Sequence, residues 1–183
     1  MIQAVVPTIP GREHHLEACL ASLEQHDIEP VVVENSPSCG EGWAVGLAQC
    51  KAPIVGLWSD DFTITHWDLA EIRDRLKKRI TVLAPVILNP DGTLQGAGGM
   101  DLDLQDGATA HNTICPIAER TVLEGFKPWP WLNHYCDTWI SQRAVWMGRG
   151  PTVTRAAVLT HHHLSPWDST EYVAWQSWLG RPS

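Results

Sequence analysis

The stretch Ile54-Val55-Gly56-Leu57-Trp58-Ser59-Asp60-Asp61-Phe62 is an apolar run that ends abruptly in two adjacent carboxylates. A continuous apolar run of this length is typical of a strand that is buried on both faces. In open α/β sheets, ligands bind outside the carboxyl ends of the strands. We therefore expect Asp60 and Asp61 to face a binding site. The alternative is that Ser59, Asp60 and Asp61 only close a turn, because Ser and Asp side chains bond to nearby backbone.

The same pair of carboxylates suits a divalent cation. Hard cations prefer oxygen ligands, and they commonly join one or two protein carboxylates to the phosphates of a nucleotide. Asp60 and Asp61 therefore predict the metal-binding corner of a nucleotide-dependent enzyme.

Composition indicates one globular domain. The chain has 183 residues, of which 44% are hydrophobic and 19% are charged, enough for a sizeable core. Its net charge of −8 disfavours non-specific binding to nucleic acid. The basic cluster at residues 73–79 is interpreted as the solvated face of a helix. No segment approaches the roughly 18 apolar residues of a membrane span, and no basic leader opens the chain, so we expect a cytoplasmic protein without membrane insertion.

The five cysteines are an odd number and contain no C-x-x-C pair. This pattern predicts neither a zinc site nor a disulfide framework. Free thiols in a reducing compartment are therefore expected.

Strand and helix patterns alternate in the first half of the chain. Strands are expected at residues 4–7, 31–33, 54–58 and 81–88, and apolar helical faces at Leu16, Cys19, Leu20 and Leu23, at Trp43, Leu47 and Cys50, and at Leu69, Ile72 and Leu76. Such alternation indicates right-handed βαβ units and a mainly parallel sheet. Thr65 and Asp68 match a capping box at the start of the third helix.

The turn signal at residues 89–92 separates this half from a less regular one. Residues 95–133 are rich in Gly and show no sustained period, so we interpret them as an irregular, ligand-facing segment. Asp137 then stands at the start of a helix whose Ile140, Ala144 and Met147 share a face. An Asp at this point acts as an N-cap worth about 1 kcal/mol, or as a carboxylate that the helix start keeps ionised and rigid while one side stays open to solvent. Both roles are compatible.

Three histidines follow a last apolar strand at residues 156–160. Strand alternation puts His161 and His163 on one side and His162 on the other. One or two imidazoles beside Asp61 would complete a site for a borderline cation such as manganese. The alternative is that they are surface histidines at the end of a strand.

The order of these features resembles glycosyltransferase family 2, the inverting enzymes with the GT-A fold, over most of the chain. The matching segments are Val5-Val6-Pro7-Thr8 with Arg12, Val31-Val32-Val33-Glu34-Asn35-Ser36, Leu57-Trp58-Ser59-Asp60-Asp61, Asp91-Gly92-Thr93-Leu94-Gln95 before Gly98-Gly99, Tyr135-Cys136-Asp137 before Arg143 and Gly148, and Val158-Leu159-Thr160-His161. The resemblance implies an α/β fold with a single Rossmann-like GT-A domain over residues 1–183. Residues 1–90 would form its nucleotide-binding half, and residues 91–183 its acceptor and metal half.

The resemblance also implies a role for each matching residue. The nucleotide would be contacted by Pro7, Thr8, Arg12, Glu34 and Asp60, the metal (Mn²⁺ or Mg²⁺) by Asp61 with His161 or His163, and the donor and acceptor loop would contain Gly98 and Gly99. Asp137 stands where the family keeps its catalytic base. A cation stabilises the charge on the leaving diphosphate, and a base within reach of the acceptor hydroxyl gives inversion in one displacement.

The expected donor is a nucleotide sugar, with uridine as the base, and the acceptor is a protein, a small molecule, a lipid precursor or a hydroxylated DNA base. Some phage-encoded members are thought to use the last of these, and a phage enzyme would act in the host cytoplasm. Two features depart from the family pattern: Cys136 precedes Asp137 where Glu is usual, and the segment from Gly99 to Asp137 is short. The acceptor pocket is therefore expected to be reduced or completed by a second subunit of a homo-oligomer.

Two other functions compete with sugar transfer. Nucleotidyl transfer also uses metal-bound carboxylates on an α/β sheet, but no Gly-rich phosphate loop followed by Lys occurs here. A non-catalytic nucleotide-binding module would keep the fold without turnover.

Overall fold

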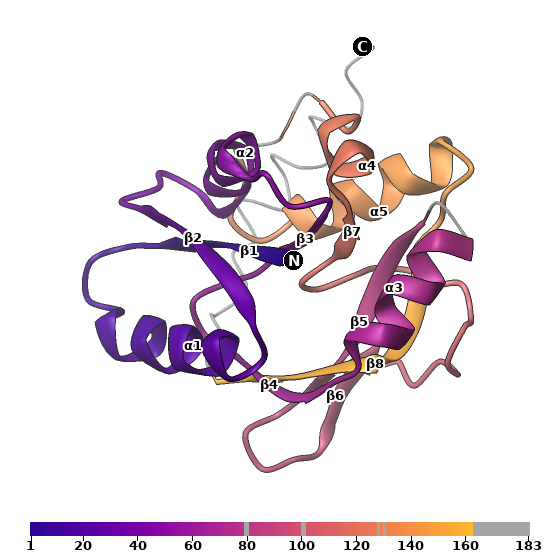
Figure 1. Ribbon diagram of the computed structural model, residues 1–183, viewed down its shortest axis with the longest axis horizontal. Helices are drawn as coiled ribbons and strands as arrows, with labels where there is room; N and C mark the ends of the chain where they lie inside the picture. Colours follow the sequence, from indigo (N-terminus) through magenta and orange to yellow (C-terminus); the bar gives the residue numbers. More distant parts are fainter. Residues whose placement is uncertain (79–80, 100–101, 128, 130, 163–183) are drawn as a thin grey trace.

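The computed structural model describes residues 1–78, 81–99, 102–127, 129 and 131–162. Its elements follow in the order β1 (Ile2–Thr8), α1 (Glu13–Gln25), β2 (Ile28–Glu34), α2 (Cys39–Gln49), β3 (Ile54–Leu57), β4 (Phe62–Trp67), α3 (Leu69–Lys78), β5 (Val82–Leu88), β6 (Leu94–Ala97), β7 (Ile117–Glu119), α4 (Arg120–Glu124), α5 (Cys136–Trp146) and β8 (Thr152–His161). The strands form one eight-stranded sheet in the order β2-β1-β3-β7-β5-β8-β4, with β6 paired to β5 (Figure 1).

Most strands of the sheet run in one direction. β1 is parallel to β2 and β3, and β5 is parallel to β8. β7 pairs antiparallel with both β3 and β5, so these two groups share a direction. β1, β2, β3, β5 and β8 therefore point the same way, while β4, β6 and β7 point the opposite way. The predicted α/β class with a mainly parallel sheet is confirmed.

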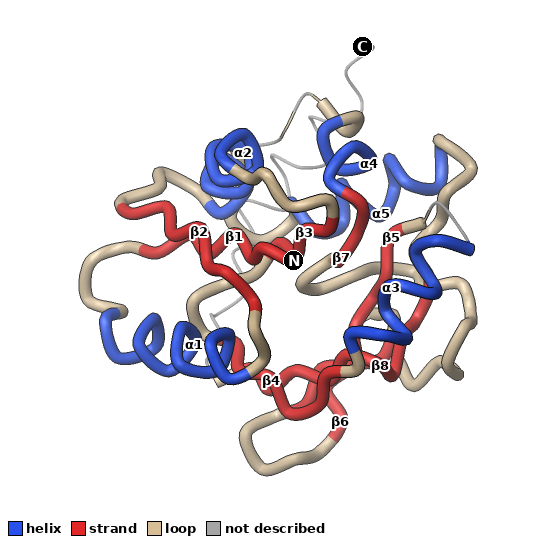
Figure 2. The backbone as a smooth tube through the Cα atoms, in the orientation of Figure 1, coloured by secondary structure: helices blue, strands red, loops and turns tan. Residues whose placement is uncertain are grey.

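Helices cover both faces of the curled sheet, α1 and α3 on one side and α2, α4 and α5 on the other (Figures 1 and 2). Successive residues of β1 point to opposite faces, because side chains alternate along a strand. Ala4 and Val6 pack with Cys19 and Leu23 of α1, whereas Val5 packs with Trp43 of α2. The two resulting core clusters hold the sheet rigid and fix the positions at which its strands end.

The predicted helical faces are largely confirmed. The core includes Cys19 and Leu23 of α1, Trp43 and Leu47 of α2, Ile72 and Leu76 of α3, and Ile140 and Ala144 of α5. Met147 is an exception, because α5 ends at Trp146 and the Met147 side chain is 43% exposed.

The predicted capping box at Thr65 is wrong. Thr65 lies in β4, where its Oγ1 contacts Thr160 Oγ1 across the strands at 2.7 Å. Asp68 caps α3 instead, because its Oδ1 accepts from the backbone N–H of Glu71 at 2.9 Å. A Thr fits either a cap or a strand, and here the pairing of β4 with β8 decides the outcome.

The prediction that residues 95–133 are irregular is wrong in part. This segment contains β7 and α4, and β6 extends into it. These elements have three to five residues each, too short to show a hydrophobic period. The two strands form through pairing with distant segments, β7 with β3 and β5, and β6 with β5.

Other predictions from composition hold in the described residues. All five cysteines are free thiols. Within residues 73–78 of the basic cluster, Arg75 pairs with Glu71 and Asp106, and Lys78 pairs with Asp74, on the outer face of α3. Among the helices of the described chain, none has the length and apolar character that a membrane span requires.

Candidate functional site

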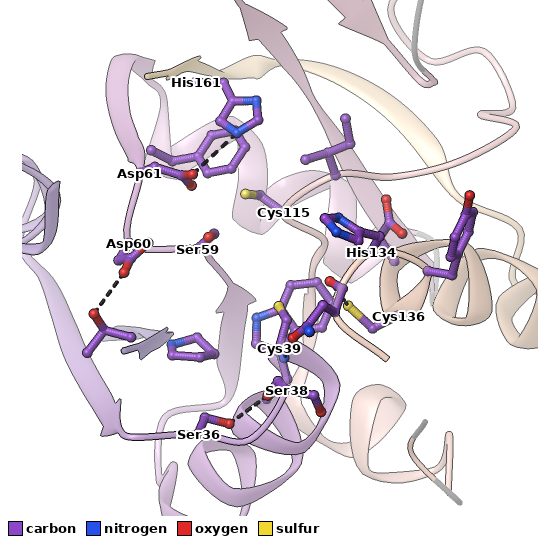
Figure 3. A pocket seen from close by; sticks show the side chains of 18 of the residues that line it. Ser36, Ser38, Cys39, Ser59, Asp60, Asp61, Cys115, His134, Cys136 and His161 are labelled. Atoms are coloured by element: carbon purple, nitrogen blue, oxygen red, sulfur yellow. Dashed lines mark hydrogen bonds and ion pairs between the residues drawn. The ribbon is translucent and has the colours of Figure 1, made fainter. Parts of the chain in front are cut away.

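A cavity of about 560 Å³ lies where β1, β3 and β8 end, between the start of α2 and the start of α5. Figure 3 shows Asp61 and His161 on one side of this cavity, and His134 and Cys136 on the opposite side. Its volume is in the range of sites that hold a small molecule or cofactor. Because the strands that end here share one direction, their following loops deliver side chains from distant parts of the chain to one place.

Asp60 is held at the end of β3 by two residues from the end of β1. The parallel register of β1 and β3 pairs Val5 with Leu57. Three residues further along both segments, Thr8 lies opposite Asp60. Thr8 Oγ1 donates to Asp60 Oδ2 at 2.7 Å, and Arg12 Nε donates to Oδ1 and Oδ2 of Asp60 at 2.9 and 3.0 Å. The buried Asp60 carboxylate is thus bound on both oxygens.

Arg12 also contacts the second carboxylate of the pair. Its Nη2 lies 2.6 Å from Asp60 Oδ1 and 2.7 Å from Asp61 Oδ2. One guanidinium therefore bridges Asp60 and Asp61, which explains how two adjacent carboxylates can be buried together.

His161 approaches Asp61 from the end of β8. Its ring stacks on Phe62 with a centroid distance of 4.3 Å, and its Nε2 lies 3.5 Å from Asp61 Oδ2. The Nδ1 atom contacts Gln95 Oε1 at 3.2 Å. Burial acts to raise the pKa of Asp61, but the hydrogen bonds and charges of His161 and Arg12 outweigh it and lower that pKa to about 2. Asp61 therefore stays ionised.

These residues fit a divalent cation that takes most of its ligands from a bound nucleotide. Asp61 Oδ1 is buried and has no hydrogen-bond partner among the described residues. Together with His161 Nε2 it offers two protein ligands of the types that manganese accepts. The described part of the chain holds no cluster of three or more His, Cys, Asp or Glu side chains that would cage a metal. Phosphate and water oxygens would have to fill the other positions, as is usual for Mg²⁺.

Asp137 lines the same cavity from α5. It is the second residue of that helix, and Tyr135 takes the N-cap position, so the N-cap interpretation of Asp137 is wrong. Its Oδ1 accepts from the backbone N–H of Thr138 at 2.7 Å, and its Oδ2 accepts from Asn112 Nδ2 at 3.3 Å.

The pKa of Asp137 is set mainly by burial. The expected ionised carboxylate is consistent with the structure at neutral pH, and the side chain is partly exposed where it lines the cavity. Burial nevertheless raises the pKa of Asp137 to about 6, although the hydrogen bonds from Thr138 and Asn112 act to lower it. Withdrawal from water is the larger effect here, because it disfavours the charged form.

Asn112 also lines the cavity, and it lies in a segment without any recognisable sequence pattern. Its Oδ1 accepts from Ser141 Oγ at 3.0 Å, and its backbone N–H donates to Gly98 O at 3.0 Å. Gly98 has φ +84, and a Cβ there would lie 2.6 Å from Val153 Cγ2. Gly98 therefore supports Asn112 through its backbone, and neither Gly98 nor Gly99 lines the cavity.

Some of the remaining predicted residues line the cavity and others do not. Pro7 lines the cavity beside Thr8 and Arg12. Glu34, at the end of β2, is exposed and lies outside the lining, whereas Ser36 and Ser38 of the next loop line it. His163 lies outside the described residues.

Solved structures share this architecture. A197 from STIV superposes with a TM-score of 0.66 at 13% identity, covering 89% of this chain and 86% of that chain. TarS 1-349 from S. aureus superposes with a TM-score of 0.60 at 15% identity, covering 88% of this chain and 60% of that chain. The fold is a GT-A fold. No protein-family model and no curated protein matches the chain.

This chain spans about 60% of the length of TarS 1-349. That neighbour has also been solved in complex with UDP-GlcNAc, and this structure superposes with a TM-score of 0.61 at 14% identity over 91% of this chain and 59% of that chain. At 13–15% identity, these superpositions show a shared fold.

Proposed function

We propose that the chain is an inverting glycosyltransferase that moves a sugar from a nucleoside-diphosphate donor to an acceptor hydroxyl. The observation that carries the proposal is that the Asp60–Asp61 pair and Asp137, from distant parts of the sequence, line one cavity of a GT-A fold. A uridine nucleotide is the proposed donor, since TarS 1-349 has been solved with UDP and with UDP-GlcNAc.

One end of the cavity is proposed to bind the donor. Asp60 would receive the ribose, and Pro7, Thr8 and Arg12 would contact the nucleotide, with Glu34 as a further contact from the end of β2. Asp61 and His161 would hold Mn²⁺ or Mg²⁺, with His163 as an untested alternative ligand. A cation bound there supplies a Lewis acid that stabilises charge on the leaving diphosphate.

The other end is proposed to activate the acceptor. The acceptor oxygen attacks the anomeric carbon from the face opposite the diphosphate, and Asp137 accepts the proton of that hydroxyl as the bond to the leaving oxygen breaks. A pKa of about 6 suits this role, because the carboxylate is ionised at neutral pH yet basic enough to take a proton. Asn112 would orient the carboxylate through its 3.3 Å hydrogen bond.

The acceptor is proposed to be a protein, a small molecule or a hydroxylated DNA base. The net charge of −8 argues against the last of these. A second copy of the chain, in a cytoplasmic homo-oligomer, is proposed to complete the acceptor side. Phage origin stays a hypothesis based on the compact domain.

A thermal-shift panel of ribonucleoside diphosphates, each with and without Mn²⁺, tests this proposal. A ligand that binds only the native state raises the melting temperature in proportion to its affinity. The transferase predicts stabilisation by one nucleoside diphosphate only when Mn²⁺ is present. Equal stabilisation without the metal favours a non-catalytic binding module, and no stabilisation by any nucleotide contradicts both functions.

A further inference from the structure

Arg12 binds the two carboxylates of the donor site unequally. Its Nε and Nη2 atoms chelate Asp60, whereas Asp61 receives only Nη2, on Oδ2 at 2.7 Å. Asp60 also keeps the 2.7 Å bond from Thr8, while Asp61 Oδ1 has no partner among the described residues. Both oxygens of Asp60 are therefore bound, whereas Asp61 keeps one oxygen without a partner among the described residues.

This contact places a positive charge where a metal ion would bind. A cation on Asp61 would share the carboxylate with the Arg12 guanidinium. Two positive charges bound to the same buried carboxylate repel each other strongly. The Asp61 side chain is only 6% exposed, so water screens this repulsion weakly. Cation binding to Asp61 is therefore weakened as long as Nη2 of Arg12 stays on this carboxylate.

The geometry allows Nη2 to leave while Arg12 keeps its anchor. Arg12 Nε binds both oxygens of Asp60, so the outer end of the guanidinium can turn away from Asp61 without losing Asp60. The Arg12 side chain is 21% exposed and lines the cavity. A diphosphate in the cavity would offer it a replacement partner, since a guanidinium binds phosphate oxygens through a planar fork.

We propose that Arg12 is an internal counter-ion of Asp61 that a bound diphosphate draws away, so that nucleotide and divalent cation bind cooperatively. The nucleotide half of this inference rests on the proposed function. Coupling of this kind is reciprocal: a nucleotide that removes Arg12 from Asp61 strengthens cation binding, and the cation strengthens nucleotide binding by the same factor.

Binding of Mn²⁺ alone tests the role of Arg12 without any nucleotide. Electron paramagnetic resonance of free Mn²⁺ would give its affinity for the wild type, Arg12→Gln and Arg12→Lys, each checked for native folding by near-ultraviolet circular dichroism. We expect Arg12→Gln to bind Mn²⁺ about tenfold more tightly than the wild type, the order of a typical coupling factor. Arg12→Lys, which keeps the charge, should lie near the wild type. Lys77→Gln removes one positive charge from an exposed position of α3 and should leave the Mn²⁺ affinity unchanged.

The same titration with saturating UDP measures the coupling. UDP should raise the Mn²⁺ affinity of every variant, because its diphosphate is itself a ligand, but by about tenfold less in Arg12→Gln than in the wild type. Mn²⁺ binding to Arg12→Gln that is absent, or no tighter than in the wild type, overturns the inference. Failure of UDP to bind the wild type contradicts the proposed function instead, and the Mn²⁺ titration without nucleotide still decides the role of Arg12.

Discussion

The two ends of the cavity put the same side chain into opposite environments. Asp61 is surrounded by Arg12 and His161, and its pKa falls to about 2. Asp137 receives hydrogen bonds from Asn112 and Thr138, and burial raises its pKa to about 6. Burial raises the pKa of both carboxyls, so the contacts of Asp61 with Arg12 and His161 make the difference.

The comparison assigns each carboxylate a task. A group that stays charged at every physiological pH suits cation binding, and a group that titrates near neutrality suits proton transfer. Pairs of carboxyls whose environments push their pKa values apart are a known way of separating such roles in one active site. Changes at Asp137 and at its hydrogen-bond partner Asn112 would alter this difference.

The largest effect is expected from Asp137→Asn on turnover. The amide keeps the shape of the side chain but cannot accept the acceptor proton, and loss of a general base costs about 10²- to 10⁴-fold in rate. Release of nucleoside diphosphate from a panel of nucleotide sugars would measure it. Asp74→Asn, which removes an exposed carboxylate paired with Lys78 on α3, should leave the rate unchanged. Equal release by wild type and Asp137→Asn would show that Asp137 is not the base.

A smaller effect is expected from Asn112→Ala on the pH profile of kcat/KM. The wild-type profile should rise through a pKa of about 6 as Asp137 loses its proton. Without the Asn112 hydrogen bond, the charged form of Asp137 is less favoured. The acidic limb of the profile should therefore shift to higher pH by about half to one unit. A purely structural role of Asn112 would instead lower the rate at every pH and leave the limb in place. Asn89→Ala, in the exposed turn beside Thr93, is the matched control.

The smallest effect is expected on stability. The folded-state pKa of Asp137 lies above its usual value of 3.8, so the native state binds this proton more tightly and loses stability as pH rises from about 4 to 6. Asp137→Asn removes that loss. It should be more stable than the wild type at pH 8 by about 1 kcal/mol, less than the full shift implies because the residue is only half-buried, and the gain should vanish near pH 4. Urea unfolding at both pH values would measure it, and a variant that is less stable at pH 8 would contradict the assigned burial.

Sequence reasoning located the donor end because its residues end apolar strands. Thr8 and Asp60 follow apolar runs that are predicted to be strands, and parallel strands bring their ends together. The bridge from Arg12 to Asp61 was not predictable, since it depends on how the loop before α1 folds back over β3. Glu34 shows the limit of the rule: it also ends a strand, yet β2 lies at the edge of the sheet and Glu34 is exposed.

Sequence reasoning was weaker at the end of the cavity where Asp137 lies. Asp137 was found through its place before a helix, but its protonation depends on Asn112, which lies 25 residues earlier in a segment without any period. The capping box predicted from Thr65 and Asp68 is wrong for a related reason. Thr65 fits a helix cap locally, but the pairing of β4 with β8 places it in a strand. Tertiary contacts between distant segments decide both cases.

The central claim is that one end of the cavity binds a cation with the donor and the other end accepts a proton. The most direct test is calorimetric titration of UDP, in the presence of Mn²⁺, into the wild type, Asp61→Asn and Asp137→Asn. We expect Asp61→Asn to lose the part of the UDP affinity that depends on Mn²⁺, and Asp137→Asn to bind UDP like the wild type. Unchanged Mn²⁺-dependent binding in Asp61→Asn, or an equal loss in both variants, would contradict the claim.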